Sequence, residues 1–206
     1  MTKSVFIVGG ADRNYANLFL SLGYSITDNP DEASLACFTG GADVSPELYG
    51  AHAHPYTGTD RYRDVKETAA FHSFLERNVP MVGICRGAQF LNVMSGGAMY
   101  QHVEGHTRSH EITDVLTGDV VYVSSTHHQM MKPSSKAVLV ASSTIGGRRE
   151  WYEGEIFHKD VSDKDIEVVY YEHTRCLCFQ PHPEFDAVEY EGMKSYFNSL
   201  LERYHD

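Results

Sequence analysis

The sequence predicts an α/β fold with a doubly wound sheet, and two observations support this. Apolar runs at residues 5–8 and 35–38 flank a helical pattern, so the chain opens in the order strand, helix, strand. That order places the strands parallel, with the helix packed on a face of the sheet. A second helical pattern at 62–78 leads into another apolar run at 81–84. Parallel strands with helices between them are therefore expected to form the core.

Turn and cap residues divide the first half of the chain. In order, we expect a strand at 5–8, a helix from Asp12 to Gly23, strands at 24–27 and 35–38, a helix at 62–78 and a strand at 81–84. Asp is a residue type that caps helix N-termini, and Gly is one that ends helices. Residues 40–61 are rich in Gly, Pro, His and Asp without apolar periodicity, which predicts a long loop of the kind that often carries function.

The second half is richer in short apolar runs. We expect a helix at 87–95, strands at 120–123, 137–141, 166–171 and 176–179, and a closing helix at 187–204 whose apolar side is a packing face. The acidic segment 150–165 is either a partner surface or a solvated hairpin, and the hairpin is the simpler interpretation. We expect residues 1–206 to form a single domain.

Composition and charge limit the classes of partner. A hydrophobic fraction of 42% and a charged fraction of 22% are ordinary for a folded globular protein. The net charge of -11 opposes binding to nucleic acid or to an anionic membrane, because both are polyanions. There is no apolar run of roughly 18 residues and no signal-peptide pattern. We therefore expect a cytoplasmic protein whose partners are small molecules or other proteins.

The four cysteines show no C-x-x-C pair, so reduced thiols are expected rather than a disulfide framework or a zinc ribbon. Cys37, Cys176 and Cys178 lie within apolar runs, where free cysteine is usually an inert core residue. Cys85 differs, because it stands between Gly83 and Gly87 where a strand passes into a helix. That pattern is typical of a nucleophile elbow, although a buried cysteine at a strand end is the alternative.

A helix N-terminus and the adjacent Arg86 favour the thiolate form of Cys85, which is the attacking species. Such a nucleophile needs a base and a group that orients the base. His182 and Glu184 provide both, in a proline-bracketed turn after the last predicted strand. The backbone N–H groups of Arg86 and Gly41 are candidate oxyanion donors. Alternatively, the Gly pair at 40–41 is only a turn.

These residues resemble the class I glutamine amidotransferase superfamily, and within it the γ-glutamyl hydrolase-like branch of cysteine peptidases that cleave γ-glutamyl amides such as γ-glutamyl-γ-aminobutyrate. The segments that carry the resemblance are GGADV at 40–44, GADVSPELYG at 41–50, RDVKE at 63–67, GICRGAQ at 83–89, NV at 92–93, GG at 96–97, YQH at 100–102, STHHQ at 125–129 and HPE at 182–184. The resemblance implies a flavodoxin-like three-layer fold, with a mostly parallel central sheet flanked by helices and a small additional β-sheet.

The resemblance also implies roles for individual residues. Cys85 would be the nucleophile, His182 the base and Glu184 the orienting acid, with Gly41 and Arg86 forming the oxyanion hole. Substrate-holding residues would be Gln89, His127, His128 and Gln129, and no cofactor would be required. Two departures concern the leaving group or acceptor: Pro181 replaces a usual tryptophan, and residues 146–165 replace a shorter, more apolar stretch.

The chain contains 12 histidines, and His102, His106 and His110 recur at fourfold spacing. On a helix that spacing would align metal ligands. Gly105 and Thr107 oppose a helix there, so no metal site is expected. The histidines are instead expected to be polar loop residues that line or rim an active-site cleft.

The leading hypothesis is hydrolysis of the γ-amide of glutamine or of a γ-glutamyl amine through a γ-glutamyl thioester on Cys85. An alternative with the same chemistry is a glutaminase subunit that delivers ammonia to a separate synthetase. Alternatives of another class are a catalytically silent glutamyl-binding or regulatory protein, and a flavodoxin-like chaperone or redox sensor. The sequence leaves open which amine departs, whether a synthetase partner exists and whether the chain forms a homo-oligomer.

Overall fold

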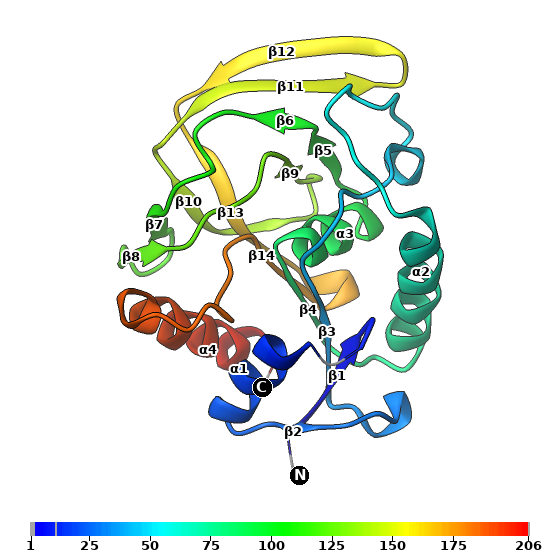
Figure 1. Cartoon of the computed structure of the whole chain (residues 1–206), viewed down its shortest axis with the longest axis vertical. Coiled ribbons are helices and arrows are strands. Elements are labelled where there is room, and N and C mark those ends of the chain that lie inside the picture. The colour runs from blue at the N-terminus through cyan, green and yellow to red at the C-terminus, as the bar shows by residue number, and fades with distance from the viewer. Residues whose placement is uncertain (1–2, 11, 206) are drawn as a thin grey trace.

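The computed structural model describes residues 3–10 and 12–205, and its centre is a nine-stranded sheet (Figure 1). The strand order is β2-β1-β3-β4-β14-β13-β10-β7-β8. Its members are β1 (Ser4–Val8), β2 (Ser25–Ile26), β3 (Leu35–Phe38), β4 (Met81–Ile84), β7 (His110–Asp114), β8 (Val120–Val123), β10 (Val138–Ser143), β13 (Asp165–Tyr171) and β14 (Cys176–Phe179). Strands β2 to β14 in that order pair in parallel, and antiparallel strands extend the sheet beyond β14.

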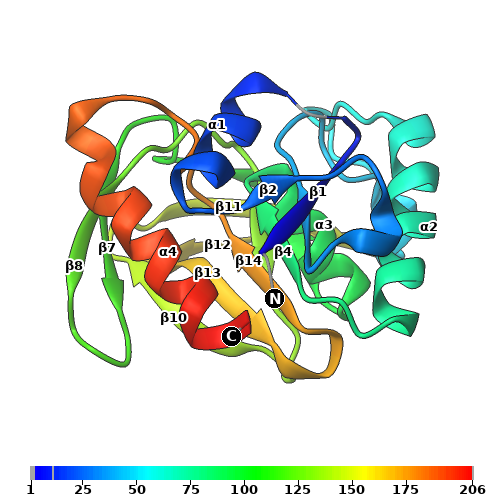
Figure 2. The ribbon, with the colours of Figure 1, turned by 90° about the horizontal axis from the view of Figure 1, so that it is seen from below.

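Helices cover both faces of this sheet. Helices α1 (Arg13–Ser21) and α4 (Glu191–His205) contribute to one hydrophobic cluster, whereas α2 (Arg61–Glu76) and α3 (Arg86–Met94) contribute to another. Strand side chains alternate between the two clusters: Cys37 joins the first, and its neighbours Ala36 and Phe38 join the second. Figure 2 shows α4 and α2 on opposite sides of the strands. The predicted three-layer α/β fold is confirmed.

Two small sheets lie outside the central one. Strands β5 (Ala98–Tyr100) and β9 (Met130–Lys132) form one, and β6 (His102–Val103), β11 (Gly147–Glu153) and β12 (Ile156–Ser162) form the other. Strands β11 and β12 make a regular hairpin at the end of the molecule far from the N-terminus (Figure 1). The acidic segment therefore forms most of a hairpin, as the simpler of its two interpretations predicts.

The main differences from the sequence-based prediction are short elements. Strands β5, β6, β7 and β9, of two to five residues, were not predicted. The bounds of β11 and β12 were not predicted either, because β11 alternates between exposed and half-buried residues rather than forming an apolar run. The closing helix begins at Glu191 and follows a 3-10 turn at Val188–Tyr190. Other 3-10 turns lie at Pro30–Glu32, at Glu172–Thr174 and, inside the predicted long loop, at Pro46–Tyr49.

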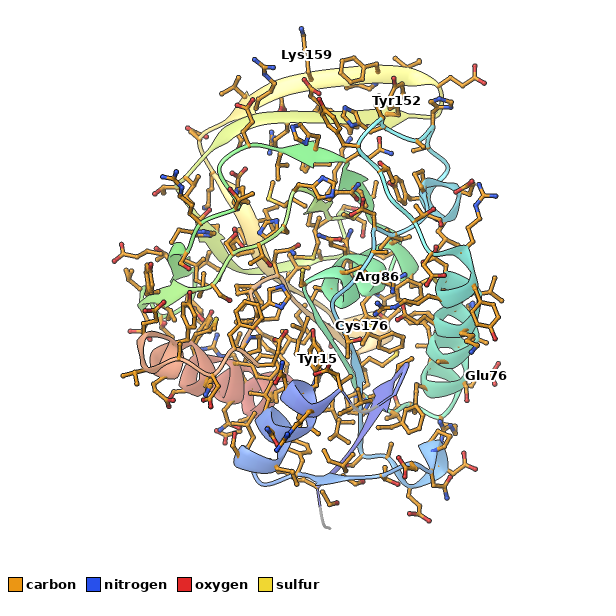
Figure 3. All side chains as sticks on the ribbon, in the orientation of Figure 1. Tyr15, Glu76, Arg86, Tyr152, Lys159 and Cys176 are labelled. Carbon is orange, nitrogen blue, oxygen red and sulfur yellow. The ribbon has the colours of Figure 1, made fainter. Side chains whose placement is uncertain are left out.

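All four cysteines are free thiols. Cys37, Cys176 and Cys178 are fully buried in the core, as predicted, and Cys176 is labelled in Figure 3. Burial raises the pKa of the Cys176 thiol to about 12, so this group is protonated at neutral pH. Within the described residues, no helix combines the length and the apolar character needed to cross a bilayer.

Candidate active site

Cys85 occupies a strained turn between β4 and α3. Its backbone has φ 53° and ψ −112°, a conformation that residues with a side chain rarely adopt. The flanking glycines are required by close packing. A Cβ at Gly83 would lie 2.3 Å from the carbonyl oxygen of Gly87, and a Cβ at Gly87 would lie 2.0 Å from that of Phe38. The structure therefore has the elbow geometry that the sequence predicts.

Strand β14 brings His182 to this elbow. It pairs in parallel with β4, so that Phe179 lies opposite Ile84, and the Cys85 N–H donates to the Phe179 carbonyl at 3.0 Å. Strands that run parallel present their carboxyl ends at the same edge of a sheet, where ligands usually bind. The turn after β14 therefore lies beside the turn after β4, although almost 100 residues separate them in the sequence.

The imidazole of His182 is coupled to a carboxylate and to the thiol. Its Nδ1 lies 2.6 Å from Oε1 of Glu184, and its backbone N–H donates to the Ser124 hydroxyl at 2.9 Å. Its Nε2 has no hydrogen-bond partner among the described residues. Burial alone would lower the His182 pKa, but interactions with Cys85 and Glu184 outweigh it and raise this pKa to about 10. With a pKa of about 10, the imidazole of His182 is protonated at neutral pH.

Two residues beside His182 were missed by the sequence analysis. The ring of Phe185 stacks on the imidazole, with centroids 4.6 Å apart and planes at 8°. The hydroxyl of Tyr15, from α1, accepts a hydrogen bond from the Gly40 N–H at 2.9 Å. Burial, together with the nearby charge of Glu184, raises the pKa of Tyr15. Phe185 adjoins a predicted site residue in the sequence, whereas nothing in the sequence distinguishes Tyr15.

The glycine turn after β3 is shaped by Arg63 of α2. The Arg63 guanidinium donates to the carbonyl oxygens of Gly40 at 2.8 Å and Thr39 at 2.7 Å, and its Nε donates to Glu67 at 2.7 Å. Gly41 has φ +146°, and a Cβ there would lie 2.1 Å from Nη1 of Arg63. Only glycine fits this position beside the arginine.

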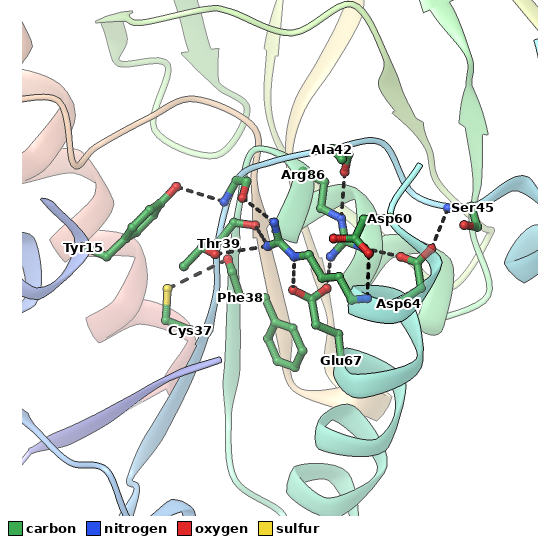
Figure 4. Close-up of polar contacts among 12 residues, drawn as sticks. Tyr15, Cys37, Phe38, Thr39, Ala42, Ser45, Asp60, Asp64, Glu67 and Arg86 are labelled. Carbon is green, nitrogen blue, oxygen red and sulfur yellow. Dashed lines mark hydrogen bonds and ion pairs between the residues drawn. The ribbon is translucent and has the colours of Figure 1, made fainter. Parts of the chain in front are cut away.

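The side chain of Arg86 belongs to the same buried network (Figures 3 and 4). It is 2% exposed, forms ion pairs with Asp64 and Glu67, and donates from Nε to the Ala42 carbonyl at 3.1 Å. Burial lowers the Arg86 pKa to about 10, which still leaves the group charged at neutral pH. The guanidinium is thus occupied by the protein itself, so only backbone atoms of Arg86 are available to a ligand.

A cavity of about 310 Å³ opens in front of Cys85. Its lining includes both predicted oxyanion residues and all four predicted substrate-binding residues: Gly41, Ala42, Asp43, Tyr56, Gly58, Cys85, Arg86, Gln89, Thr126, His127, His128 and Gln129. The sequence analysis did not identify Asp43 or Tyr56. His182 and Glu184 do not line this cavity, so they adjoin Cys85 from another side.

The four predicted substrate-binding residues differ in what their side chains contact. The Gln89 amide donates to the Gln129 carbonyl at 2.9 Å, and Nδ1 of His127 contacts the same oxygen at 2.9 Å. The Gln129 side chain donates to the Thr57 hydroxyl at 3.3 Å. His128 is different, because its side chain is 40% exposed and its Nε2 lies 3.2 Å from Asp43. His128 and Asp43 therefore offer polar groups to the cavity.

The three histidines that recur at fourfold spacing lie in two different environments in the structure. The His102 ring stacks on that of His54, with centroids 5.6 Å apart, whereas His106 and His110 are buried with His127 against Asp165 and Glu167. The prediction that His106 and His110 line or rim the cleft is therefore wrong, although His106 does lie in a turn. His110 begins strand β7, and His106 is 0% exposed, because acidic side chains of β13 provide its polar partners.

Local charge and burial set the protonation of this cluster. Burial opposes a charge on His106, but its contacts with Asp165 and Glu167 raise its pKa to about 9. Burial lowers the pKa of His127 to about 4, so that ring is neutral at neutral pH. For Glu167, burial favours the acid form, yet the surrounding imidazoles lower its pKa to about 2.

The fold and the cysteine elbow together define an α/β protein of the class I glutamine amidotransferase type. The sequence profile described as Peptidase C26 matches residues 34–184, and the chain belongs to that family of glutamine amidotransferase-like proteins. The chain is 32% identical over 178 residues to Protein NtpR of Enterococcus hirae, an alignment that covers 75% of this chain and 68% of that protein.

Other relatives are longer than the segment they share with this chain. A candidate glutamine amidotransferase of Mycobacterium tuberculosis is 31% identical over 137 residues, which is 57% of this chain and 44% of that protein. The carbamoyl phosphate synthase small chain of Helicobacter hepaticus is 25% identical over 186 residues, with 88% of this chain and 44% of that protein covered. For three curated relatives, the aligned segment is 34%, 44% and 60% of their length.

Solved structures share the fold at low sequence identity. PurLQS from Thermotoga maritima aligns with a TM-score of 0.65 and 15% identity, over 98% of this chain and 100% of that chain. A glutamine amidotransferase from the same organism aligns with a TM-score of 0.62 and 15% identity, over 98% and 84% of the two chains. At this identity the similarity concerns the fold alone.

Proposed function

We propose that the protein hydrolyses the γ-amide of glutamine or of a γ-glutamyl amine through a thioester on Cys85. The observation that carries this proposal is the strained Cys85 elbow beside His182, whose ring is held by Glu184 at 2.6 Å. A nucleophile, a base and an orienting carboxylate in this relation are the requirements of covalent acyl transfer.

In the first half-reaction, the Cys85 thiolate attacks the γ-carbonyl carbon, and the electron pair of the carbonyl moves to oxygen. The N–H groups of Gly41 and Arg86 are the proposed donors to that oxyanion. His182 gives its proton to the departing nitrogen, the C–N bond breaks, and ammonia or an amine leaves. In the second half-reaction, His182 removes a proton from water, which attacks the thioester and releases glutamate while Cys85 regains its thiolate.

The cavity residues support recognition of a glutamyl group. We assign direct contact with the polar α-substituents of the substrate to His128 and Asp43, because these side chains face the open cavity. Gln89 and His127 act indirectly by holding the Gln129 carbonyl, and with it the loop that carries His128. Gln129 is held in turn by Thr57 and borders the same cavity.

The direct test is glutamate release from glutamine and from a panel of γ-glutamyl amines, with Cys85→Ala, His182→Ala and the hairpin control His158→Ala. Preference for a γ-glutamyl amine, abolished in the first two variants and retained in the control, supports a free-standing hydrolase. Failure of every substrate contradicts the proposal and favours the catalytically silent glutamyl-binding alternative. Release that survives Cys85→Ala contradicts the assignment of Cys85 as the nucleophile.

A second candidate is a glutaminase subunit that supplies ammonia to a separate synthetase. The alignment of 88% of this chain with a carbamoyl phosphate synthase small chain favours it. Slow, Cys85-dependent action on glutamine alone would support this candidate.

We further propose that the chain acts as one domain, because both hydrophobic clusters pack on the same sheet. We also propose that it acts in the cytoplasm, because its four thiols are free.

A further inference from the structure

A buried cluster of three histidines and two carboxylates lies beneath the loop that carries His128 and Gln129. Its members are His106, His110, His127, Asp165 and Glu167, and none is more than 8% exposed. Among the described residues, the ion-pair partners of the two carboxylates are imidazoles alone. Buried carboxylates need compensating positive charge, which either protons on the histidines or a bound cation can provide.

Only one of the two ring nitrogens of His127 has a hydrogen-bond partner among the described residues. Its Nδ1 lies 2.9 Å from the Gln129 carbonyl oxygen, which can only accept, so Nδ1 carries the proton. In the neutral ring, Nε2 then holds a lone pair. This atom lies 3.9 Å from Oε2 of Glu167, and neither atom has a hydrogen-bond partner within the described part of the chain. Two acceptors therefore face each other in a buried space.

His106 repeats this arrangement. Its Nε2 lies 2.8 Å from Oδ2 of Asp165 and is the natural donor to it. Its Nδ1, which has no hydrogen-bond partner among residues 3–10 and 12–205, lies 3.2 Å from Oε1 of Glu167. One ligand atom from each of His106, His127 and Glu167 lies within 4.8 Å of the others.

These distances suit a divalent cation. Zinc bonds of about 2.1 Å at tetrahedral angles separate neighbouring ligand atoms by roughly 3.4 Å. The observed separations are 3.2 Å to Oε1 of Glu167 and 3.9 Å to its Oε2, and the whole set lies within 4.8 Å, so a small contraction would complete the site. In metal sites, a ligating histidine donates its other N–H to a carboxylate or a backbone carbonyl. Asp165 and the Gln129 carbonyl are placed for that contact, and His110 Nε2 lies 3.1 Å from Glu167.

We propose that Nδ1 of His106, Nε2 of His127 and the carboxylate of Glu167 bind one Zn²⁺, with water as the fourth ligand. The ion would join the segment before β7, the loop after β8 and strand β13 at one point. It would thereby fix the backbone at residue 127, next to the side chain of His128 at the cavity. This site is separate from Cys85, and the proposal does not depend on the proposed hydrolysis.

The test uses the tag-free full chain carrying Cys85→Ala, because a thiolate beside an imidazole is itself a zinc ligand set. After removal of metal by a chelator, zinc is titrated by calorimetry and cobalt by absorption spectroscopy. We expect one equivalent of zinc to bind and to raise Tm, and cobalt to give a four-coordinate spectrum without thiolate charge-transfer bands. Glu167→Gln and His106→Gln should each weaken zinc binding by at least about 100-fold.

The matched control is His102→Gln, which removes a histidine of the same fourfold series outside the cluster and should leave zinc affinity unchanged. No zinc bound by the Cys85→Ala protein, or equal affinity in the Glu167→Gln, His106→Gln and His102→Gln proteins, would overturn the proposal. If the cluster variants do not fold, the stoichiometry and the cobalt spectrum of the Cys85→Ala protein decide the question alone. One equivalent without thiolate bands supports the site, and none excludes it.

Discussion

His182 binds its proton more tightly in the folded chain than it would in water. Its buried ring lies between Cys85 and Glu184, and these two neighbours raise its pKa from 6.5 to about 10 against the opposing effect of burial. The contacts on which the proposed attack by Cys85 depends therefore also stabilise the fold while the ring is charged. The positive charge of the His182 ring therefore links the stability of the fold to the proposed chemistry.

The sign of this linkage predicts how stability changes with pH. Because the folded pKa exceeds the unfolded one, the contribution of His182 is fully present below about pH 6.5 and is lost as the pH rises toward 10. Urea unfolding from pH 6 to 10 should show a smaller loss of stability in Cys85→Ala than in the wild type. His106, whose pKa is raised to about 9, titrates in both proteins and cancels in the difference. Equal pH dependence of the two proteins would contradict the coupling.

At the residue scale, the sequence predicted those residues of the candidate site that stand in short, recognisable motifs. Cys85, His182 and Glu184 stand in short motifs, and the structure brings the three side chains together. Tyr15 and Asp43 were not predicted, because their positions depend on contacts between distant segments. The burial of His106 was likewise unpredictable, since its acidic partners come from a strand almost 60 residues later.

At the scale of elements, the elbow requires that β4, α3 and β3 approach without side chains between them. We predict that Gly87→Ala destabilises the fold by roughly 3 kcal/mol, because its Cβ would lie 2.0 Å from a backbone oxygen that cannot move away freely. Thermal and urea unfolding measure this effect. Gly192→Ala in α4 is the control, since its Cβ meets nothing within 4 Å and stability should change by no more than about 1 kcal/mol. Similar values for the two variants would contradict the packing argument.

Helix α2 acts on the glycine turn through Arg63. We predict that Arg63→Lys lowers kcat by about 10- to 100-fold with little change in KM, because a single ammonium cannot hold both carbonyl oxygens and the turn loses its fixed geometry. Steady-state kinetics on the substrate found in the amide panel provide the measurement. Arg61→Lys is the matched control, because that neighbouring side chain is 77% exposed and pairs only with Glu47 among the described residues. A change confined to KM would show that Arg63 does not act through the turn.

Strands were predicted at the correct bounds where the sequence contains a short continuous apolar run. The runs 81–84 and 176–179 coincide with β4 and β14, because continuous apolar residues suit strands that are buried on both faces. The run 120–123 coincides with β8, an edge strand whose apolar residues are largely exposed. Strand β6 escaped prediction, since it has only two residues and pairs with a distant partner, β11. The turn before α4 was merged with the helix because Val188 to Tyr190 continue its apolar and acidic pattern.

At the scale of the whole molecule, the two halves of the sheet have different roles. The parallel half brings the turns after β3, β4 and β14 to one edge, where Cys85 and His182 meet. The antiparallel half and its connecting loops supply the cavity wall at residues 126–129 and the histidine cluster beneath it. The pairing of the parallel half could be predicted from strand and helix order. In the other half, strands at 120–123, 137–141 and 166–171 were predicted, but their pairing was not, because antiparallel strands joined by loops leave several pairings open.

The most direct test of the central claim is to detect the acyl group on Cys85. The protein is mixed with glutamine or the preferred γ-glutamyl amine, quenched in acid within one turnover, digested and analysed by mass spectrometry. We expect one γ-glutamyl group on the peptide that contains Cys85, and none in Cys85→Ala. In Glu184→Gln the adduct should accumulate further if the substitution slows the attack of water on the thioester more than it slows formation of the thioester. Amide turnover without this adduct, or turnover that persists in Cys85→Ala, would contradict a thioester on Cys85.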